Sequence, residues 1–199
     1  PETMAALLEQ LKRAMSSLQA DTPTAGVNWD LAISQAKSIA HGGSIAITDE
    51  ARRQISSAIS IGSLWLNEAT SMAELTNEPK LLSRELWVAD SMPLFQSLSQ
   101  PVANRMSEAL SEHLTQNAPE ELAEVLGNAS GILKTAGGAM FAMQLGQSLG
   151  KMSHEVLAGG DIGLPLFKDH RPAFVTQNVE KFIAGLEIES DQAYLYLAI

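Results

Sequence analysis

Apolar residues recur every three or four positions over much of the chain, which is the spacing of one face of a helix. The clearest case follows Thr48, which can cap a first turn that contains Asp49 and Glu50. We expect this helix to end near Thr70. The positions predicted to be buried along it are Ile55, Ala58, Ile59, Gly62, Trp65 and Leu66.

The same spacing predicts helices elsewhere in the chain. One covers residues 4–20, and another begins after a capping Asn28 and ends at the glycines of 41–43. Later in the chain, a helix over residues 178–186 precedes one that Ser190 caps. No stop signal follows this last helix before the sequence ends, which is unusual for a natural terminus.

Two prolines interrupt the helical pattern that begins after a capping Ser83. A proline inside a helix removes a hydrogen bond and clashes with the preceding turn, at a cost of about 3 kcal/mol. We therefore expect breaks or kinks near Pro93 and Pro101, then a loop at 117–119 and a short helix to about Leu126. The apolar positions that share one face are Leu86, Trp87, Leu94, Phe95, Leu98, Val102, Met106, Ala109 and Leu110.

The longest predicted helix covers residues 130–158 and carries small residues at every fourth position. Glycine costs a helix about 1 kcal/mol relative to alanine, so several in register indicate a compensating close approach of a neighbouring helix. We expect this helix to be central in the fold. The small-residue ridge consists of Gly138, Ala142, Gly146 and Gly150.

These elements predict an all-α fold of several helices around that central one, in a single domain over residues 1–199. Residues 173–175 are the candidate for a very short strand, so at most one small strand pair is expected. The chain is 45% hydrophobic but only 5% aromatic, so aliphatic residues and methionine must fill its core. The eight methionines are therefore expected mainly in the core, although a Met-rich groove is the alternative.

The charge balance excludes some partners. A formal net charge of −10 argues against binding to nucleic acid or to anionic membrane surfaces. The most apolar stretch, residues 131–150, contains Lys134 and is interpreted as a buried helix rather than a membrane span. With no cysteine and no visible signal peptide, a cytoplasmic location is expected.

The most suggestive local motif for chemistry is His154-Glu155, followed by Ala158. Zinc hydrolases of the H-E-x-x-H type place two histidines one helical turn apart, with the glutamate activating the metal-bound water. Ala158 stands where the second histidine would be. We therefore interpret His154 as a structural residue near a helix end.

Other candidates also favour structural roles. Two glycine pairs, 137–138 and 159–160, lack the strand and the Gly-Lys ending of a phosphate loop, so packing and a turn explain them. Asp161 has no acidic or histidine partner nearby in the sequence, and the polar run 168–171, which contains His170, is typical of a solvated loop. His41 and His113 lie at predicted helix ends. We assign no catalytic, cofactor-binding or metal-ligating residue in the chain.

Six segments, in order along the chain, nevertheless carry a resemblance. They are VNWDLA (27–32), LWLNEA (64–69), SRELWV (83–88), GGAMFAMQLG (137–146), DIGLPL (161–166) and AYLYLA (193–198). Together they resemble the zincin-like metallopeptidases of actinobacteria, which are described as hydrolases or zinc-dependent metalloproteases. Some relatives are described as associated with deazaflavin cofactor biosynthesis.

The resemblance implies that the zinc motif belongs to the helix beginning at Ser190 and follows directly after Ile199. Zinc would then be a cofactor of a longer protein, and residues 1–199 would be inactive by themselves. Two alternatives stay open: a non-catalytic helical scaffold or interaction protein with a degenerate metallopeptidase fold, and a small-molecule binding module beside the central helix. The substrate, the protein partners and the oligomeric state do not follow from the sequence.

Overall fold

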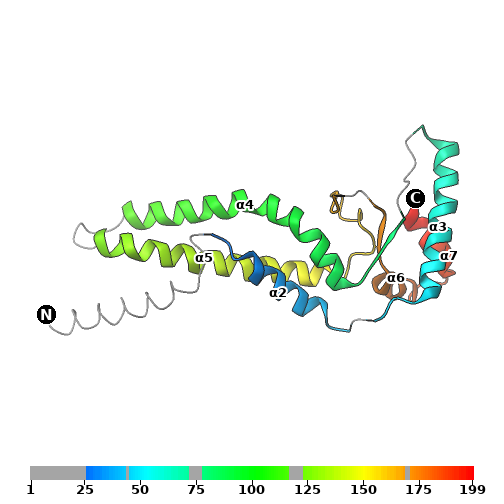
Figure 1. The fold of residues 1–199 in the computed structure, drawn as a ribbon, viewed down its shortest axis with the longest axis horizontal. Coiled ribbons are helices and arrows are strands. Elements are labelled where there is room, and N and C mark those ends of the chain that lie inside the picture. Colours follow the sequence, from blue (N-terminus) through cyan, green and yellow to red (C-terminus); the bar gives the residue numbers. More distant parts are fainter. Residues whose placement is uncertain (1–25, 44, 72–77, 117–122, 169–170) are drawn as a thin grey trace. The chain divides into compact units, whose positions relative to one another are not determined.

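The computed structural model describes residues 26–43, 45–71, 78–116, 123–168 and 171–199. Within these ranges it contains six helices and one two-stranded sheet, which confirms the mainly helical fold class (Figure 1). The predicted helix over residues 4–20 lies outside the described residues. The elements are α2 (Trp29–Ala40), α3 (Asp49–Ala69), β1 (Lys80–Leu82), α4 (Arg84–Gln116), α5 (Ala123–Met152), β2 (Ala173–Val175), α6 (Thr176–Ile183) and α7 (Ser190–Ala198).

The chain divides into two compact units. The described part of unit 1 comprises residues 26–32, 96–116 and 123–144, and unit 2 comprises the described residues of 33–95 and 145–199. The sheet, α3, α6 and α7 belong to unit 2 alone, whereas α2, α4 and α5 contribute to both units. The organisation as a single domain stays a prediction.

Three helix starts are capped by the side chains that the sequence indicated. The Thr48 hydroxyl accepts a hydrogen bond from the Ala51 amide at 3.1 Å, at the start of α3. Asn28 Oδ1 accepts from the Leu31 amide at 2.9 Å, and Ser83 Oγ accepts from the Leu86 amide at 3.1 Å. The cap predicted at Ser190 is wrong, because Ser190 is the first helical residue of α7 and Glu189 before it makes no side-chain cap.

The helix α4 continues through both prolines, so it has no break near Pro93 or Pro101; a kink at either proline stays a prediction. Both prolines are exposed, where water can donate to the carbonyl group that loses its helical partner. The apolar face predicted for this helix is also only partly buried. Trp87 is fully buried, but Leu86, Leu98, Val102 and Met106 are each at least half exposed.

The small-residue ridge of α5 takes close neighbours, as its spacing predicted. In unit 1, a Cβ atom on Gly138 would lie 2.2 Å from the carbonyl oxygen of Gly26. In unit 2, a Cβ atom on Gly150 would lie 2.7 Å from Ile39 Cβ and 3.0 Å from the carbonyl oxygen of Ala36. Both distances are too short for a real side chain, so glycine is needed at both positions.

The limits of α5 differ from the prediction. It begins at Ala123 and therefore includes most of the short helix expected to end near Leu126. It ends at Met152, six residues before Ala158. Residues 153–158 form turns whose backbone groups are served by side chains from later in the chain, as described below.

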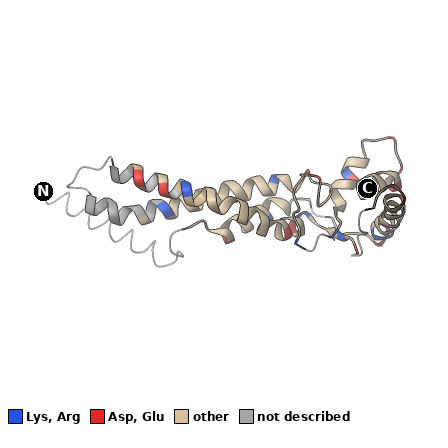
Figure 2. Ribbon diagram, turned by 90° about the horizontal axis from the view of Figure 1, so that it is seen from above, with Lys and Arg blue, Asp and Glu red and all other residues tan. Residues whose placement is uncertain are grey.

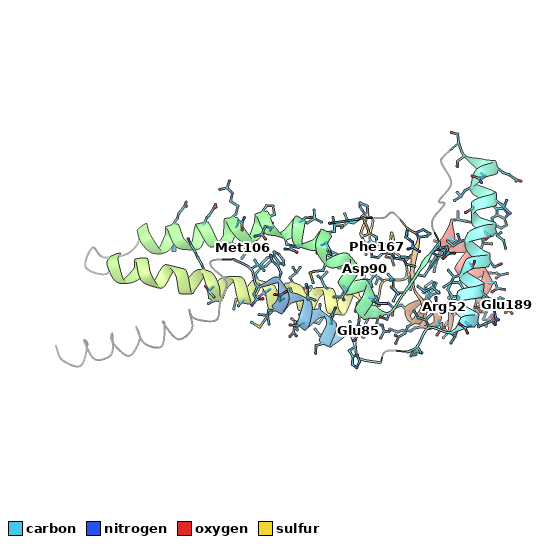
Figure 3. All side chains as sticks on the ribbon, viewed as in Figure 1. Arg52, Glu85, Asp90, Met106, Phe167 and Glu189 are labelled. Carbon is cyan, nitrogen blue, oxygen red and sulfur yellow. The ribbon has the colours of Figure 1, made fainter. Side chains whose placement is uncertain are left out.

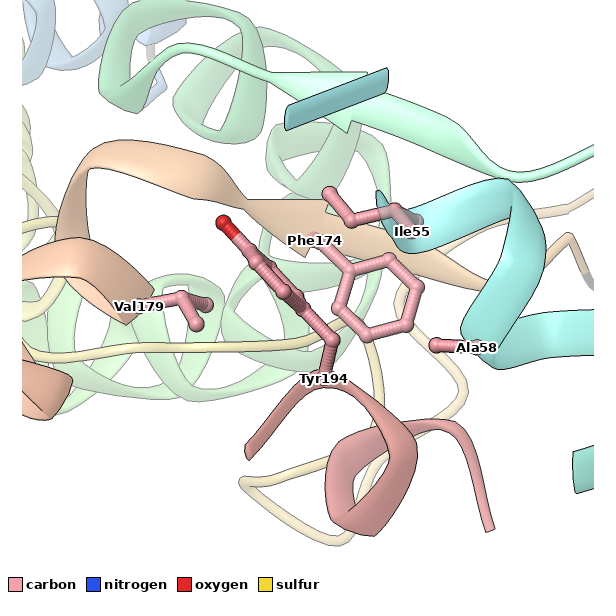
Figure 4. Packing of buried hydrophobic residues seen from close by; sticks show 5 residues of the cluster. All are labelled: Ile55, Ala58, Phe174, Val179 and Tyr194. Carbon is pink, nitrogen blue, oxygen red and sulfur yellow. The ribbon is translucent and has the colours of Figure 1, made fainter. Parts of the chain in front are cut away.

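The hydrophobic core of unit 2 lies where α3, β2, α6 and α7 meet. Its fully buried members are Ile55, Ala58, Phe174, Val179 and Tyr194, and the rings of Phe174 and Tyr194 meet edge-on with centroids 6.4 Å apart (Figure 4). Of the positions predicted to be buried in α3, Ile55, Ala58 and Gly62 are buried. Ile59 and Leu66 are only partly buried, and Trp65 is 54% exposed.

The predicted strand over residues 173–175 is confirmed as β2. It pairs in parallel with β1, with Leu81 opposite Phe174, and Ala158 adds an antiparallel bridge to Phe174. The sequence did not indicate β1, because its two leucines suit a helix as well as a strand, whereas Phe174 and Val175 in β2 favour a strand. The sheet brings residues near 80, 158 and 174 together, and these surround the candidate site.

Candidate functional site

His154 and Glu155 do not form half of a helical zinc motif. Both follow the end of α5, in a turn, and Ala158 belongs to the bridge beside β2. The His154 ring donates from Nε2 to the carbonyl oxygen of Ile39 at 3.0 Å. This histidine therefore anchors the end of α2 to the turn, in agreement with a structural role.

Two side chains bind backbone groups just after the end of α5, one from α6 and one from the loop that follows α5. Asn178 Nδ2 donates to the carbonyl oxygens of Ser153 and Val156, at 2.8 and 2.6 Å. Asp161 Oδ2 accepts from the Leu157 amide at 2.5 Å and from the Ala158 amide at 3.3 Å. Asp161 thus caps the turn, and its carboxylate is already engaged with two backbone donors.

A buried arginine joins the same region. Arg84 Nε donates to Asn178 Oδ1 at 2.8 Å, and Arg84 Nη1 donates to the carbonyl oxygen of Gly42 at 3.2 Å. Burial lowers the pKa of Arg84, and the negative charge of Glu155 opposes this shift. The neighbouring Gln177 Nε2 donates to the carbonyl oxygen of Gly43. These contacts hold the start of α4 and the end of α2 against α6.

An apolar cleft of about 240 Å³ lies beside β2. Its walls come from residues 158–160, 164–167 and 171–174, together with Leu197 and Ala198 in the last turn of α7. Leu166, Phe167 and Phe174 are nearly fully buried. Of the lining residues in the described ranges, Arg171 alone is charged.

The Phe167 wall of the cleft is fixed by charged neighbours. Lys80 Nζ lies 5.4 Å from the centre of the Phe167 ring, within the range of a cation–π contact, and 3.1 Å from Asp90 Oδ2. Phe167 and Asp90 are labelled in Figure 3. Gly159 is packed against the same ring, since a Cβ atom there would lie 2.6 Å from Phe167 Cε2. In contrast, a Cβ atom on Gly160 would meet nothing within 4 Å.

Neither His41 nor His113 is among the residues that line the cleft. His41 Nδ1 is 2.6 Å from Glu85 Oε1 on an exposed surface, and His113 is exposed in the last turn of α4. His170 lies outside the described residues. The expectation that methionines fill the core holds for Met92, but it is wrong for the exposed Met106, Met140 and Met143.

The described residues do not fit a zinc ion. No group of three His, Asp or Glu side chains that could hold a metal occurs in the part of the chain that the structure describes. Figure 2 shows acidic and basic residues distributed along the described helices and loops. Within the same ranges, no helix has the length and apolar character needed to cross a membrane.

Comparison with known proteins decides the family. The family model described as zincin-like metallopeptidase matches residues 27–199. The chain belongs to the zincin-like metallopeptidase family. No curated protein and no solved structure matches it.

The cleft of this zincin-like metallopeptidase was not evident in the sequence. Its residues come from a loop, a three-residue strand and the end of α7, which only the fold brings together. One signal was available: the polar run 168–171 contains Arg171, which was assigned to a solvated loop and in fact lines the cleft.

Proposed function

We propose that this chain provides the helical scaffold and the substrate cleft of a zinc-dependent peptidase, and that residues 1–199 hydrolyse no peptide bond by themselves. The family match over residues 27–199 supports the peptidase class. The observation that carries the proposal is the cleft, whose wall includes Leu197 and Ala198. These residues form the end of α7, the helix after which the resemblance expects the zinc motif.

The cleft suits one part of a peptide better than a whole organic cofactor. Pockets that enclose a drug-sized molecule measure roughly 300–1,000 Å³. The cleft, at about 240 Å³, lies below that range. An apolar amino-acid side chain from a longer, mostly solvated substrate fits this size, so the cleft favours a peptide over the small-molecule alternative.

The ligand chemistry of the described residues supports the proposed inactivity of the isolated chain. Catalytic zinc is held by three protein side chains with an open position for water. His154 is engaged with Ile39, and Asp161 is engaged with two amides. A zinc ion in this protein therefore needs ligands from outside the described residues.

Calorimetric zinc titration and a peptide-library hydrolysis assay test the proposal. We expect residues 1–199 to bind zinc no better than the His154→Gln variant, and to cleave no peptide with zinc or with chelator. Chelator-sensitive cleavage by a longer product of the same gene would support the peptidase class. A tight, stoichiometric zinc site that is lost in His154→Gln would overturn the proposed inactivity.

One observation favours the non-catalytic alternative of an interaction protein. Leu98, Val102 and Met106 expose apolar side chains at every fourth position of α4. Sets of exposed apolar residues often mark contact surfaces. If a longer gene product also cleaves no peptide, this alternative replaces the peptidase. The cytoplasmic location, the actinobacterial origin and the link to deazaflavin biosynthesis stay predictions.

A further inference from the structure

Among the described residues that line the apolar cleft, Arg171 is cationic and the others are uncharged. From this arrangement we propose that the cleft binds the C-terminal residue of a peptide, with the apolar side chain inside and the free carboxylate paired to Arg171. This inference rests on the proposed function only in taking a peptide as the ligand.

The interior of the cleft selects an apolar group. Phe167 and Phe174 are 5% and 1% exposed, and Leu166 is 2% exposed, so the walls are tightly packed side chains. Transfer of a leucine- or phenylalanine-sized side chain from water to these walls buries apolar surface and therefore favours binding. A polar or charged side chain would find no partner on these walls and would lose its hydration.

The position of Arg171 is fixed by the backbone around it. Its Nε donates to the carbonyl oxygen of Glu78 at 2.8 Å. The next residue, Pro172, accepts a hydrogen bond from the Lys80 amide at 2.7 Å, beside the paired strands β1 and β2. The guanidinium is therefore held at the cleft by the sheet rather than by a flexible loop alone.

The remaining donors of Arg171 are available to a carboxylate. Its two terminal nitrogens make no hydrogen bond to any other residue in the described ranges. In the part of the chain that the structure describes, the Asp90 carboxylate is paired with Lys80, and the Asp161 carboxylate is engaged with two amides. A planar guanidinium binds a carboxylate with parallel, charge-assisted hydrogen bonds, which a peptide amide cannot accept as strongly.

The test compares two ligands that differ only at the C-terminus. The affinity of N-acetyl-alanyl-leucine for residues 1–199 is measured by calorimetry against that of its C-terminal amide, with chelator present so that zinc chemistry plays no part. We expect the free acid to bind about tenfold or more tightly than the amide, as loss of a charge-assisted hydrogen bond predicts. Equal affinities, or no binding of either ligand, would overturn the inference.

Two pairs of variants separate specific effects from general ones. Arg171→Gln should abolish the preference for the acid, and Lys168→Gln should keep it, because both remove one positive charge but Lys168 does not line the cleft. Gly160→Leu should block binding, whereas Gly185→Leu should not. A Cβ atom meets nothing within 4 Å at either position, but only Gly160 of the two lines the cleft. A preference that survives in Arg171→Gln would contradict the role of this residue.

Octanoate distinguishes a peptide terminus from a free fatty acid. It shares the apolar group and the carboxylate but lacks the peptide bond. Tighter binding of octanoate than of the dipeptide acid would overturn the peptide assignment. The binding assay contains chelator, so a negative result there counts against the bound peptide terminus and not against the peptidase function. Only the hydrolysis assay tests the peptidase function.

Discussion

Asn178 lies against Arg84 in a buried contact, with Arg84 Nε donating to Asn178 Oδ1 at 2.8 Å. The same asparagine donates to two backbone carbonyls after the end of α5. One side chain thus links α6 with the start of α4 and the end of α5. It also provides the main side-chain partner of a buried cation.

Replacing Asn178 should therefore be costly. Asn178→Ala leaves the Arg84 guanidinium and the carbonyl oxygens of Ser153 and Val156 buried without this partner. We expect a loss of about 2–4 kcal/mol in the free energy of unfolding, measured by urea denaturation. The exposed Gln192→Ala is the control and should change it by less than about 0.5 kcal/mol. Equal effects of the two variants would contradict the role of Asn178.

Tyr194 should make stability fall in alkali. Burial raises the pKa of its hydroxyl from 10.0 to about 12, and the negative charge of Glu180 adds to the shift. Folding favours the neutral phenol, so this contribution is present below pH 10 and is lost as the pH rises towards 12. We expect the wild type to lose about 2–3 kcal/mol more than Tyr194→Phe over this interval.

Unfolding free energies measured at several pH values check this difference. The control is Tyr196→Phe, because Tyr196 is 77% exposed and its hydroxyl is already in water. This variant should lose stability in parallel with the wild type. If the unfolding free energy of Tyr194→Phe falls with pH as steeply as that of the wild type, the burial of the Tyr194 hydroxyl does not cause the loss of stability in alkali.

The α5 ridge should not tolerate even one added methyl group at Gly150. Alanine would gain about 1 kcal/mol in helix propensity. Its Cβ atom, however, would lie 2.7 Å from Ile39 Cβ and 3.0 Å from the Ala36 carbonyl oxygen. We expect a net loss of about 1–3 kcal/mol in the free energy of unfolding, since overpacking forces backbone shifts. Gly185→Ala, with nothing within 4 Å, should be nearly neutral; a stabilised Gly150→Ala would show that the ridge is looser.

The exposed apolar positions of α4 should accept polar residues. Val102 is 54% exposed, so Val102→Gln should change the free energy of unfolding by less than about 0.5 kcal/mol. Met92 is 2% exposed, and Met92→Gln should cost several times more, because it buries an amide among apolar side chains. A large cost for Val102→Gln that grows with protein concentration would show that self-association covers this face.

Local chemistry explains which parts of the fold were predictable. Thr48, Asn28 and Ser83 cap helices by accepting hydrogen bonds from amides three residues later. Such local contacts can be predicted from the neighbouring sequence alone. The ridge on α5 was likewise predictable from its spacing. Trp65 was misplaced because helical periodicity gives a face but not where that face ends.

The cleft depends on contacts between distant segments. Lys80 and Phe167 meet across 87 positions of sequence, since 167 − 80 = 87, and Leu197 joins them from the last helix. No local pattern records such a meeting. The end of α5 was misjudged for the same reason, because Asn178, from α6, binds the backbone carbonyls of Ser153 and Val156 there.

The two adjacent glycines of the cleft have a practical consequence. Gly159 is closed in by Phe167, whereas Gly160 has open space around it. The chain contains no cysteine, so Gly160→Cys would introduce its only thiol, at the rim of the cleft. A fluorophore attached there would report directly on whatever enters the cleft, without any need to know the reaction in advance.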